Sequence, residues 1–285
     1  MESFFTILEK RVEECSSLLC VGLDPHVSDL SHPTAESALH FCLNLVKQTA
    51  PYAAAFKPNA AFFEQFGAEG WAVLKTVIEA IQEQSNRLGS VIPVILDAKR
   101  GDIASTAKAY AKSAFETLGA HSITLSPYLG KDSIDPFIQN PEKGVFLLCK
   151  TSNPGAGDLQ DLNISGVPGA LNDSSQPLPL YEHVARLAQT WNTLNNIGLV
   201  VGTTQPQALL RVRAAVPEMW FLAPGIGAQG GDLETALKAG LRKDGKGLLL
   251  PISRGISQAA NFAHAAAAFR DSILKIRLQM QKNSF

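Results

Sequence analysis

The 285-residue sequence has no long apolar run and no marked excess of either charge. No apolar stretch approaches the ~20 residues that span a bilayer. Segment 1–14 is amphipathic and acidic, which is not typical of a signal peptide. With a formal net charge of -1, the chain has no basic excess of the kind that binds nucleic acid or a membrane surface. We therefore expect a cytoplasmic protein that binds neither.

Cysteine and histidine motifs are also absent. The four cysteines and six histidines are scattered, with no C-x-x-C, H-x-H or H-x-x-x-H spacing. This pattern is typical of reduced cytosolic thiols and argues against a disulfide framework or a zinc site. The sequence therefore predicts no metal centre.

Short apolar runs alternate with amphipathic helical stretches along the chain. Strands that alternate with helices pair in parallel, and eight such units predict a single α/β domain over 1–285, a closed (β/α)8 TIM barrel. A doubly wound open sheet is the alternative. The predicted strands are 17–24, 53–59, 91–99, 122–126, 144–151, 197–202, 219–223 and 247–252. The predicted helices are 34–50, one within 68–87, 103–118, a short one near Ile134, 181–194, 205–215, 233–239 and 259–281.

A stretch rich in Gly, Pro, Asn and Asp, 153–179, is long for a barrel loop and is predicted to be an insertion. Long ordered loops tend to be functional. For the middle of the insertion, 158–176, an ordered functional loop and a solvated disordered one fit the sequence equally well.

The apolar run 91–96 ends in a group of charged residues that includes Asp97, Lys99 and Asp102. Side chains two apart on a strand share a face, so Asp97 and Lys99 should point the same way. Asp102 stands just before the next predicted helix, where a carboxylate is favoured. Burying such a cluster costs free energy that pairing only partly offsets. The pattern favours a catalytic site, with solvated ion pairs as the alternative. The intervening lysines disfavour a site for a hard cation.

Polar residues follow at least six predicted strands, at the end where barrel enzymes place their active sites. These positions are Asp24, 57–59, Asp97 with Lys99, 150–153, 224–231 and 253–255. The G-x-G-x-x-G match at 225–230 comes too late in the chain for a dinucleotide-binding fold. We interpret it as a backbone cradle for a phosphate, assisted by free N–H groups at the helix start near Leu233 and by the guanidinium of Arg254. The alternative is that the glycines only turn the chain.

Together these segments resemble the orotidine 5′-phosphate decarboxylase family, in its longer bacterial subfamily, over nearly the whole chain. The most specific element is D-x-K-x-x-D at Asp97, Lys99 and Asp102, followed by Ile103 and Thr106. The supporting segments are 22–24, 56–59, 151–154, 223–231 and 253–256. Sugar-phosphate decarboxylases of the same superfamily share D-x-K-x-x-D. The combination of this motif with segment 224–231 is much more specific to the family.

The resemblance implies a carbon–carbon lyase that converts orotidine 5′-monophosphate to uridine 5′-monophosphate and CO₂, the last step of de novo UMP synthesis, without a cofactor. Lys99 would protonate C6 of the pyrimidine as CO₂ leaves, and Asp97 would lie against the departing carboxylate. Lys57 would link Asp97 to the ribose. Asp102 would come from the partner subunit of a homodimer that shares its active sites across the interface.

The resemblance also implies how the substrate is held. Asp24 and Lys57 would bind the ribose hydroxyls, and Ser152 would bind the pyrimidine ring. Gln229 and Arg254 would hold the phosphate. The implied catalytic residues are Lys99, Asp97, Asp102 and Lys57. The implied substrate-binding residues are Asp24, Lys57, Asn59, Ile103, Thr106, Ser152, Pro224, Gln229, Gly230 and Arg254.

The chain departs from the family pattern mainly in the insertion after Asn153 and in Ser253, where many relatives have glycine. The chemistry agrees with the implied roles, because loss of CO₂ leaves an electron pair in the ring plane that a fixed ammonium can stabilise. Three other functions stay open: a decarboxylase or epimerase acting on an acyclic sugar phosphate with Mg²⁺, a Schiff-base aldolase using Lys57 or Lys99, and an inactive nucleotide-binding sensor.

Overall fold

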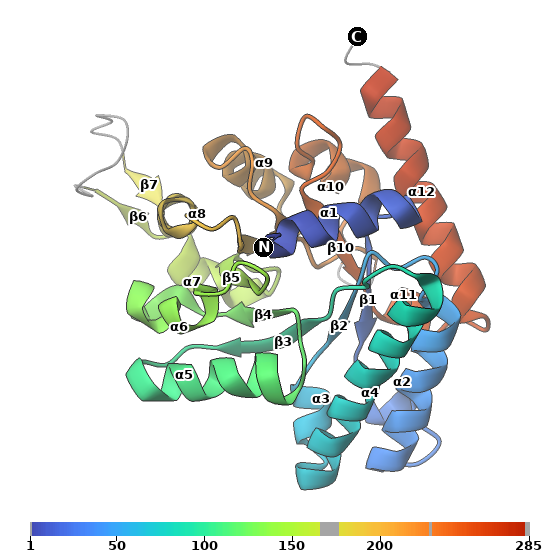
Figure 1. Ribbon diagram of the computed structural model, residues 1–285. Coiled ribbons are helices and arrows are strands. Elements are labelled where there is room, and N and C mark those ends of the chain that lie inside the picture. Colours follow the sequence, from blue (N-terminus) through green and yellow to red (C-terminus); the bar gives the residue numbers. More distant parts are fainter. Residues whose placement is uncertain (1, 166–176, 228–229, 283–285) are drawn as a thin grey trace.

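The computed structural model describes residues 2–165, 177–227 and 230–282 (Figure 1). Its main sheet has eight parallel strands in the order β2-β1-β10-β9-β8-β5-β4-β3. These are β1 (Leu19–Leu23), β2 (Ala55–Pro58), β3 (Ile95–Arg100), β4 (Ser122–Leu125), β5 (Gly144–Lys150), β8 (Ile197–Val201), β9 (Phe221–Leu222) and β10 (Leu248–Ile252).

The two outer strands of this order, β2 and β3, also meet. Parallel bridges join Phe56 to Val94 and Asn59 to Asp97, and the Ala60 N–H donates to the Asp97 carbonyl at 3.1 Å. The sheet therefore closes on itself, which confirms the (β/α)8 barrel and excludes the doubly wound alternative.

Helices surround the barrel (Figure 1). They are α1 (Phe4–Cys15), α2 (Ala35–Thr49), α3 (Ala61–Glu64), α4 (Gly67–Leu88), α5 (Ala104–Lys112), α6 (Asp135–Ile138), α7 (Gly157–Gln160), α8 (Leu180–Trp191), α9 (Pro206–Ala215), α10 (Leu233–Gly240), α11 (Arg254–Ser257) and α12 (Phe262–Lys282). No helix in the described ranges is long and apolar enough to cross a membrane.

Helix α1 lies across the amino-terminal ends of the strands, where only an amphipathic segment was expected. The Phe5 ring stacks on Trp220 with centroids 6.1 Å apart and meets Phe146 edge-on at 5.7 Å. The Phe4 N–H donates to the Pro141 carbonyl just before β5. The apolar face of α1 thus covers this end of the barrel. The carboxyl end is left open for a pocket lined by polar residues.

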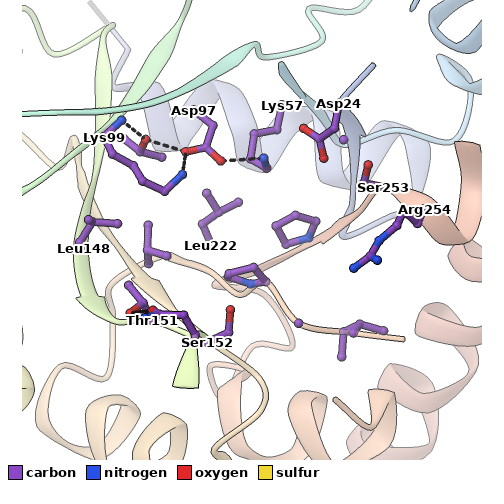
Figure 2. Close-up of a pocket in the computed structure, with 18 of the residues that line it drawn as sticks. Asp24, Lys57, Asp97, Lys99, Leu148, Thr151, Ser152, Leu222, Ser253 and Arg254 are labelled. Carbon is purple, nitrogen blue, oxygen red and sulfur yellow. Dashed lines mark hydrogen bonds and ion pairs between the residues drawn. The ribbon is translucent and has the colours of Figure 1, made fainter. Parts of the chain in front are cut away.

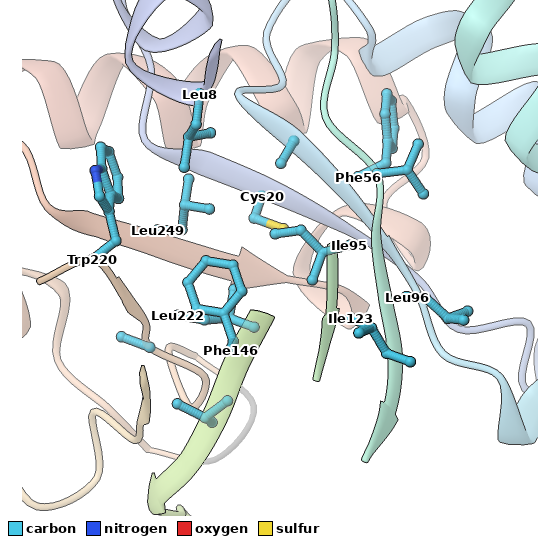
Figure 3. Close-up of a cluster of buried hydrophobic side chains, with 14 of the residues drawn as sticks. Leu8, Cys20, Phe56, Ile95, Leu96, Ile123, Phe146, Trp220, Leu222 and Leu249 are labelled. Atoms are coloured by element: carbon cyan, nitrogen blue, oxygen red, sulfur yellow. The ribbon is translucent and has the colours of Figure 1, made fainter. Parts of the chain in front are cut away.

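The barrel interior and the layer beneath the helices are apolar. Figure 3 shows side chains from α1 and from several strands packed together, among them Leu8, Cys20, Ile123 and Phe146. All four are at most 1 % exposed. Such burial is the main stabilising contribution to the fold.

One predicted helix and one predicted strand are clearly shorter in the structure. The predicted helix 103–118 is α-helical only to Lys112, and Ser113–Thr117 form a π-helical turn. Strand β9 keeps only two of the five predicted residues.

The described parts of the predicted insertion are ordered. They contain α7 and a small antiparallel pair, β6 (Asn163–Ile164) with β7 (Leu178–Pro179). Residues 166–176 lie outside the described ranges.

Candidate active site

A pocket of about 660 Å³ opens at the carboxyl ends of the strands, and all eight strands of the barrel contribute to it (Figure 2). Its lining residues are Gly22, Asp24, His26, Lys57, Asp97, Lys99, Thr124, Leu148, Thr151, Ser152, Asn153, Gln160, Val200, Leu222, Pro224, Gly225, Ile226, Pro251, Ser253, Arg254 and Gly255. This is the end of the barrel at which the sequence placed the polar residues.

Asp97 lies between two ammonium groups on one wall of the pocket (Figure 2). Its Oδ2 accepts from Lys57 Nζ at 2.8 Å, and its Oδ1 accepts from Lys99 Nζ at 2.6 Å. Lys57 and Asp97 are buried, at 7 % and 8 % exposure, whereas half of the Lys99 side chain is exposed. The Lys99 amine is therefore held by an acid and still accessible to a ligand.

Burial and charge act in opposite directions on the buried pair. Burial by itself raises the pKa of Asp97, but the ammonium groups of Lys57 and Lys99 outweigh it and hold that pKa well below its usual value. Burial likewise lowers the pKa of Lys57, but the carboxylates of Asp97 and Asp24 outweigh it and raise that pKa. Both groups are therefore charged at neutral pH, and a Lys57 that keeps its proton is poorly suited to form an imine.

A backbone irregularity brings Asp97 and Lys99 together. The register between β3 and β4 shifts between Leu96 and Arg100, and Lys99 has a φ of 47°. The two side chains share a side of the barrel as expected, but through a bulge rather than through the regular alternation of a strand.

Two buried oxygens in the pocket wall have no hydrogen-bond partner within the described protein, Asp24 Oδ1 and Ser253 Oγ. Buried polar atoms are normally paired, so these atoms are suited to a ligand that carries hydroxyl groups. Gly22 is needed beside them, because a Cβ at this position would lie 2.8 Å from Ser253 Cβ.

Only part of the described glycine loop lines the pocket. Gly225 and Ile226 line it together with Arg254. The N–H of Gly230, by contrast, donates to the Gly227 carbonyl at 2.8 Å, and Gly230 does not line the pocket. Gln229 lies outside the described residues.

The structure caps part of the helix start near Leu233, where the sequence predicts free N–H groups for a phosphate. Helix α10 begins after Asp232, whose Oδ1 accepts from the Thr235 N–H at 2.8 Å and from the Thr235 hydroxyl at 2.6 Å. The Asp232 carboxylate thus takes one backbone N–H of this helix start, and no residue of α10 lines the pocket.

The predicted site residues divide into two groups. Those that line the pocket are Asp24, Lys57, Asp97, Lys99, Ser152, Pro224 and Arg254. Among the described residues, those that do not line it are Asn59, Asp102, Ile103, Thr106 and Gly230. Asn59 accepts from the Ala61 N–H, and Asp102 accepts from the Ile103 N–H at 2.8 Å.

Hydrogen bonds that could not be predicted from the sequence join the insertion to β5. Gln160 exchanges two hydrogen bonds with Thr151, both 2.9 Å long. Next to them, Lys150 is 1 % exposed and donates to Asp161 at 2.7 Å. A register shift between Leu148 and Lys150 lets Leu148 and Thr151 line the pocket while Lys150 does not. The only signal in the sequence is a lysine directly after an apolar strand.

Fold and site together define the class: a (β/α)8-barrel enzyme whose pocket joins a Lys–Asp–Lys cluster to a glycine loop and an arginine. Within the described ranges, no group of three or more His, Cys, Asp or Glu side chains could hold a metal ion. Residues 17–269 match the model of the orotidine 5′-phosphate decarboxylase / HUMPS family, and the chain belongs to this family.

Individual relatives agree with this assignment. The chain is 45 % identical over 279 residues to an orotidine 5′-phosphate decarboxylase of Roseiflexus castenholzii, covering 96 % of each protein. It is 52 % identical to the solved Leishmania donovani OMP decarboxylase, with a TM-score of 0.84 and coverage of 97 % of this chain and 99 % of that one. It is 53 % identical to L. donovani UMP synthase, with a TM-score of 0.86; the match covers 97 % of this chain but only 57 % of that longer protein.

Proposed function

We propose that this chain decarboxylates orotidine 5′-monophosphate to uridine 5′-monophosphate and CO₂, with Lys99 as the proton donor. The observation that supports it best is Asp97, buried between Lys57 and Lys99 on one wall of a pocket that also presents Arg254 (Figure 2). A nucleoside monophosphate that carries a ring carboxylate has two acidic groups. Its carboxylate can lie beside Lys99, and its phosphate can pair with Arg254. This reaction is the last step of de novo UMP synthesis.

The reaction breaks one bond and forms one. The bond between C6 and the carboxylate breaks and CO₂ leaves. The electron pair of that bond stays on C6, in the plane of the ring. The Lys99 ammonium stabilises this charge and gives C6 a proton, so no cofactor is needed as an electron sink. Asp97 keeps the amine in place through the 2.6 Å ion pair. Solvent then returns a proton to Lys99.

The pocket walls suggest how the rest of the substrate is bound. Asp24, with its unpaired Oδ1, and Lys57 would hold the ribose hydroxyls. Ser152 would bond the pyrimidine, and Arg254 would pair with the phosphate as a forked cation. The phosphate lies far from the bond that breaks, so its binding energy can be used to order the site.

An absorbance assay tests the proposal. Purified protein is mixed with orotidine 5′-monophosphate in EDTA, and loss of the substrate absorbance is expected. Lack of turnover would contradict the proposal. Turnover of an acyclic sugar phosphate that depends on Mg²⁺ would favour the related sugar-phosphate enzymes instead, and trapping of an imine by borohydride would favour an aldolase.

We also propose a homodimer in which Asp102 completes the site of the partner. Asp102 does not line its own pocket, and Ile103 beside it is 51 % exposed. The neighbouring turn after β4 adds Tyr128 at 82 % and Leu129 at 47 % exposure. These segments are adjacent, because the Ser126 N–H donates to the Arg100 carbonyl at 2.7 Å. Apolar side chains gathered around a carboxylate fit a self-association surface.

Mixing two inactive variants tests the shared site. In a mixed dimer of Lys99→Ala and Asp102→Ala, one site has both defects and the other has neither. Random exchange of subunits should therefore restore about a quarter of the wild-type activity. No recovery in a mixture that light scattering shows to be dimeric would contradict the sharing of Asp102.

A cytoplasmic location is part of the proposal. It is supported by four cysteines, all free and buried, because such thiols are typical of a reducing compartment. Fractionation of cells that produce the protein, followed by immunoblotting, tests it.

A further inference from the structure

The bulge in β3 leaves part of that strand without partners on β4. Residues 97–99 face Thr124 alone, because the register of the two strands shifts between Leu96 and Arg100. A regular parallel ladder would pair the backbone N–H groups of β3 with carbonyls of the neighbouring strand, and a bulge interrupts this pattern. Lys99 also adopts a φ of 47°, which residues other than glycine rarely do. Something outside the ladder must hold this conformation.

The hydroxyl of Thr124 holds the conformation of the bulge. Its Oγ1 accepts from the Ala98 N–H at 3.1 Å and from the Lys99 N–H at 2.9 Å, and it donates to Asp97 Oδ1 at 2.9 Å. A threonine hydroxyl has one donor and two acceptor lone pairs. Its three hydrogen bonds to β3 therefore use its full hydrogen-bonding capacity. Thr124 is 1 % exposed, and water has little access to compete for these bonds.

The same Asp97 oxygen that Thr124 contacts also binds the Lys99 amine, at 2.6 Å. The hydroxyl therefore reaches the lysine twice, through its backbone N–H and through the carboxylate that orients its amine. We propose that Thr124 is a positioning residue: its hydroxyl fixes the bulge and thereby sets the Lys99 amine where C6 of the substrate must lie. The expected effect of Thr124 on kcat rests on the proposed function. Thr124 itself transfers no proton.

A pair of substitutions separates the hydroxyl from the shape of the side chain. Thr124→Val keeps the shape but removes the donor and both acceptors. We expect kcat to fall about 100-fold, equivalent to about 2.7 kcal/mol, as for a displacement of a catalytic group by ~1 Å. KM and the Kd for uridine 5′-monophosphate should stay within about threefold, since the phosphate contacts are untouched. Thr124→Ser keeps the hydroxyl and should keep kcat within about threefold.

Thr49→Val is the matched control. Thr49 is also fully buried, and its hydroxyl donates to the Leu45 carbonyl in α2, away from the pocket. The same chemical change there should leave kcat and KM unchanged. If Thr124→Val does not fold, Thr124→Cys takes its place, because a thiol is only a weak donor and acceptor; the same loss in kcat, smaller in size, is expected.

Two kinetic results would overturn the proposal: a Thr124→Val enzyme with kcat within threefold of wild type, or a KM and product Kd that rise as much as kcat falls. A crystal structure of Thr124→Val tests the positioning without any assay. We expect the ion pair between Lys99 Nζ and Asp97 Oδ1 to be lost, and an unchanged pair would overturn the proposal. Wild-type protein that does not turn over orotidine 5′-monophosphate would contradict the proposed function, and the crystal structure would still decide the role of Thr124.

Discussion

Both ends of the barrel hold cations in place, but with different partners. At the carboxyl end, Lys57 and Lys99 are held by one carboxylate, Asp97, and face a pocket. At the amino end, Arg11 and Arg213 are 4 % and 8 % exposed and bind mainly backbone carbonyls.

Arg213 shows the second arrangement most fully. Its guanidinium stacks on Phe221 at 3.7 Å and donates to five carbonyls, those of Val216, Pro217, Met219, Gly240 and Gly247. Burial, followed by the charge of Arg242, lowers the pKa of Arg213 to about 9, so it stays protonated at neutral pH. Its donors are directed at the backbone, and it ties together the turns that lead into β9 and β10.

The difference teaches how to separate function from stability in a barrel. A cation whose donors end on carbonyls has little capacity left for a ligand. A cation held by a carboxylate beside a cavity keeps donors, and in Lys99 a transferable proton, for chemistry. Substitutions at the amino end should therefore change stability, and those at the carboxyl end should change catalysis.

The largest expected effect is that of Lys99→Ala on catalysis. It removes both the proton donor and the charge beside C6, and kcat/KM should fall at least 10³-fold, about 4 kcal/mol. The free energy of unfolding should change little, because half of the side chain is exposed. Steady-state kinetics and urea unfolding measure the two quantities, with Lys108→Ala on α5 as the control. Turnover within tenfold of wild type would show that Lys99 is not the proton donor.

Arg213→Met should reverse this pattern. It leaves five carbonyls short of a donor, and we expect a loss of about 3–5 kcal/mol in the free energy of unfolding, with kcat/KM of the folded enzyme unchanged. Arg211→Met is the matched control on the same helix. Arg211 is half exposed and pairs with Glu182, so its loss should be below about 1 kcal/mol. Equal losses in the two variants would contradict the contrast between the two ends.

His121 adds a pH dependence at the amino end. Burial, and then the charge of Lys143, lowers the pKa of His121 to about 4, and its Nδ1 accepts from the Val94 N–H. Between pH 6.5 and 4 the unfolded chain binds a proton that the folded protein does not, so stability should fall as the pH is lowered, by roughly 3 kcal/mol in all. His121→Asn should remove this part of the pH dependence of Tm. An identical slope in both proteins would exclude His121 as its source.

The smallest expected effect is at Lys150. This lysine tests the contrast most strictly, because it lies at the carboxyl end of the barrel but outside the pocket. Asp161→Asn leaves this buried ammonium without an acid, and we expect a loss of about 1.5–2 kcal/mol in the free energy of unfolding with kcat within about threefold. Asp158→Asn, on helix α7 just before Asp161, is the control. A large fall in kcat without a loss of stability would place Lys150 among the catalytic cations.

The sequence was a good guide wherever a feature depends on local pattern. Runs such as 144–151 and 247–252 are apolar because parallel strands are buried on both faces, and they proved to be β5 and β10 within a residue or two. Asp24, Lys57 and Arg254, which stand at the ends of different predicted strands, line one pocket, because the carboxyl ends of parallel strands meet at one end of a barrel.

Features that depend on register could not be predicted. Thr124 is an ordinary threonine in a short apolar run, and its role follows from a shift between β3 and β4. The pairing of Lys150 with Asp161 requires the fold of the insertion. The Asp232 cap on the helix start near Leu233 could not be predicted either, because a glycine-rich turn before a helix looks the same whether a phosphate or the chain's own carboxylate caps it.

The sequence by itself determined the barrel, its family and the charged residues at one end, because hydrophobic periodicity and motif spacing are local properties. Only the tertiary structure decided which of these charges share a pocket and which atoms hold them in place. The reason is that a strand bulge changes where a side chain points without leaving a mark in the pattern of residues.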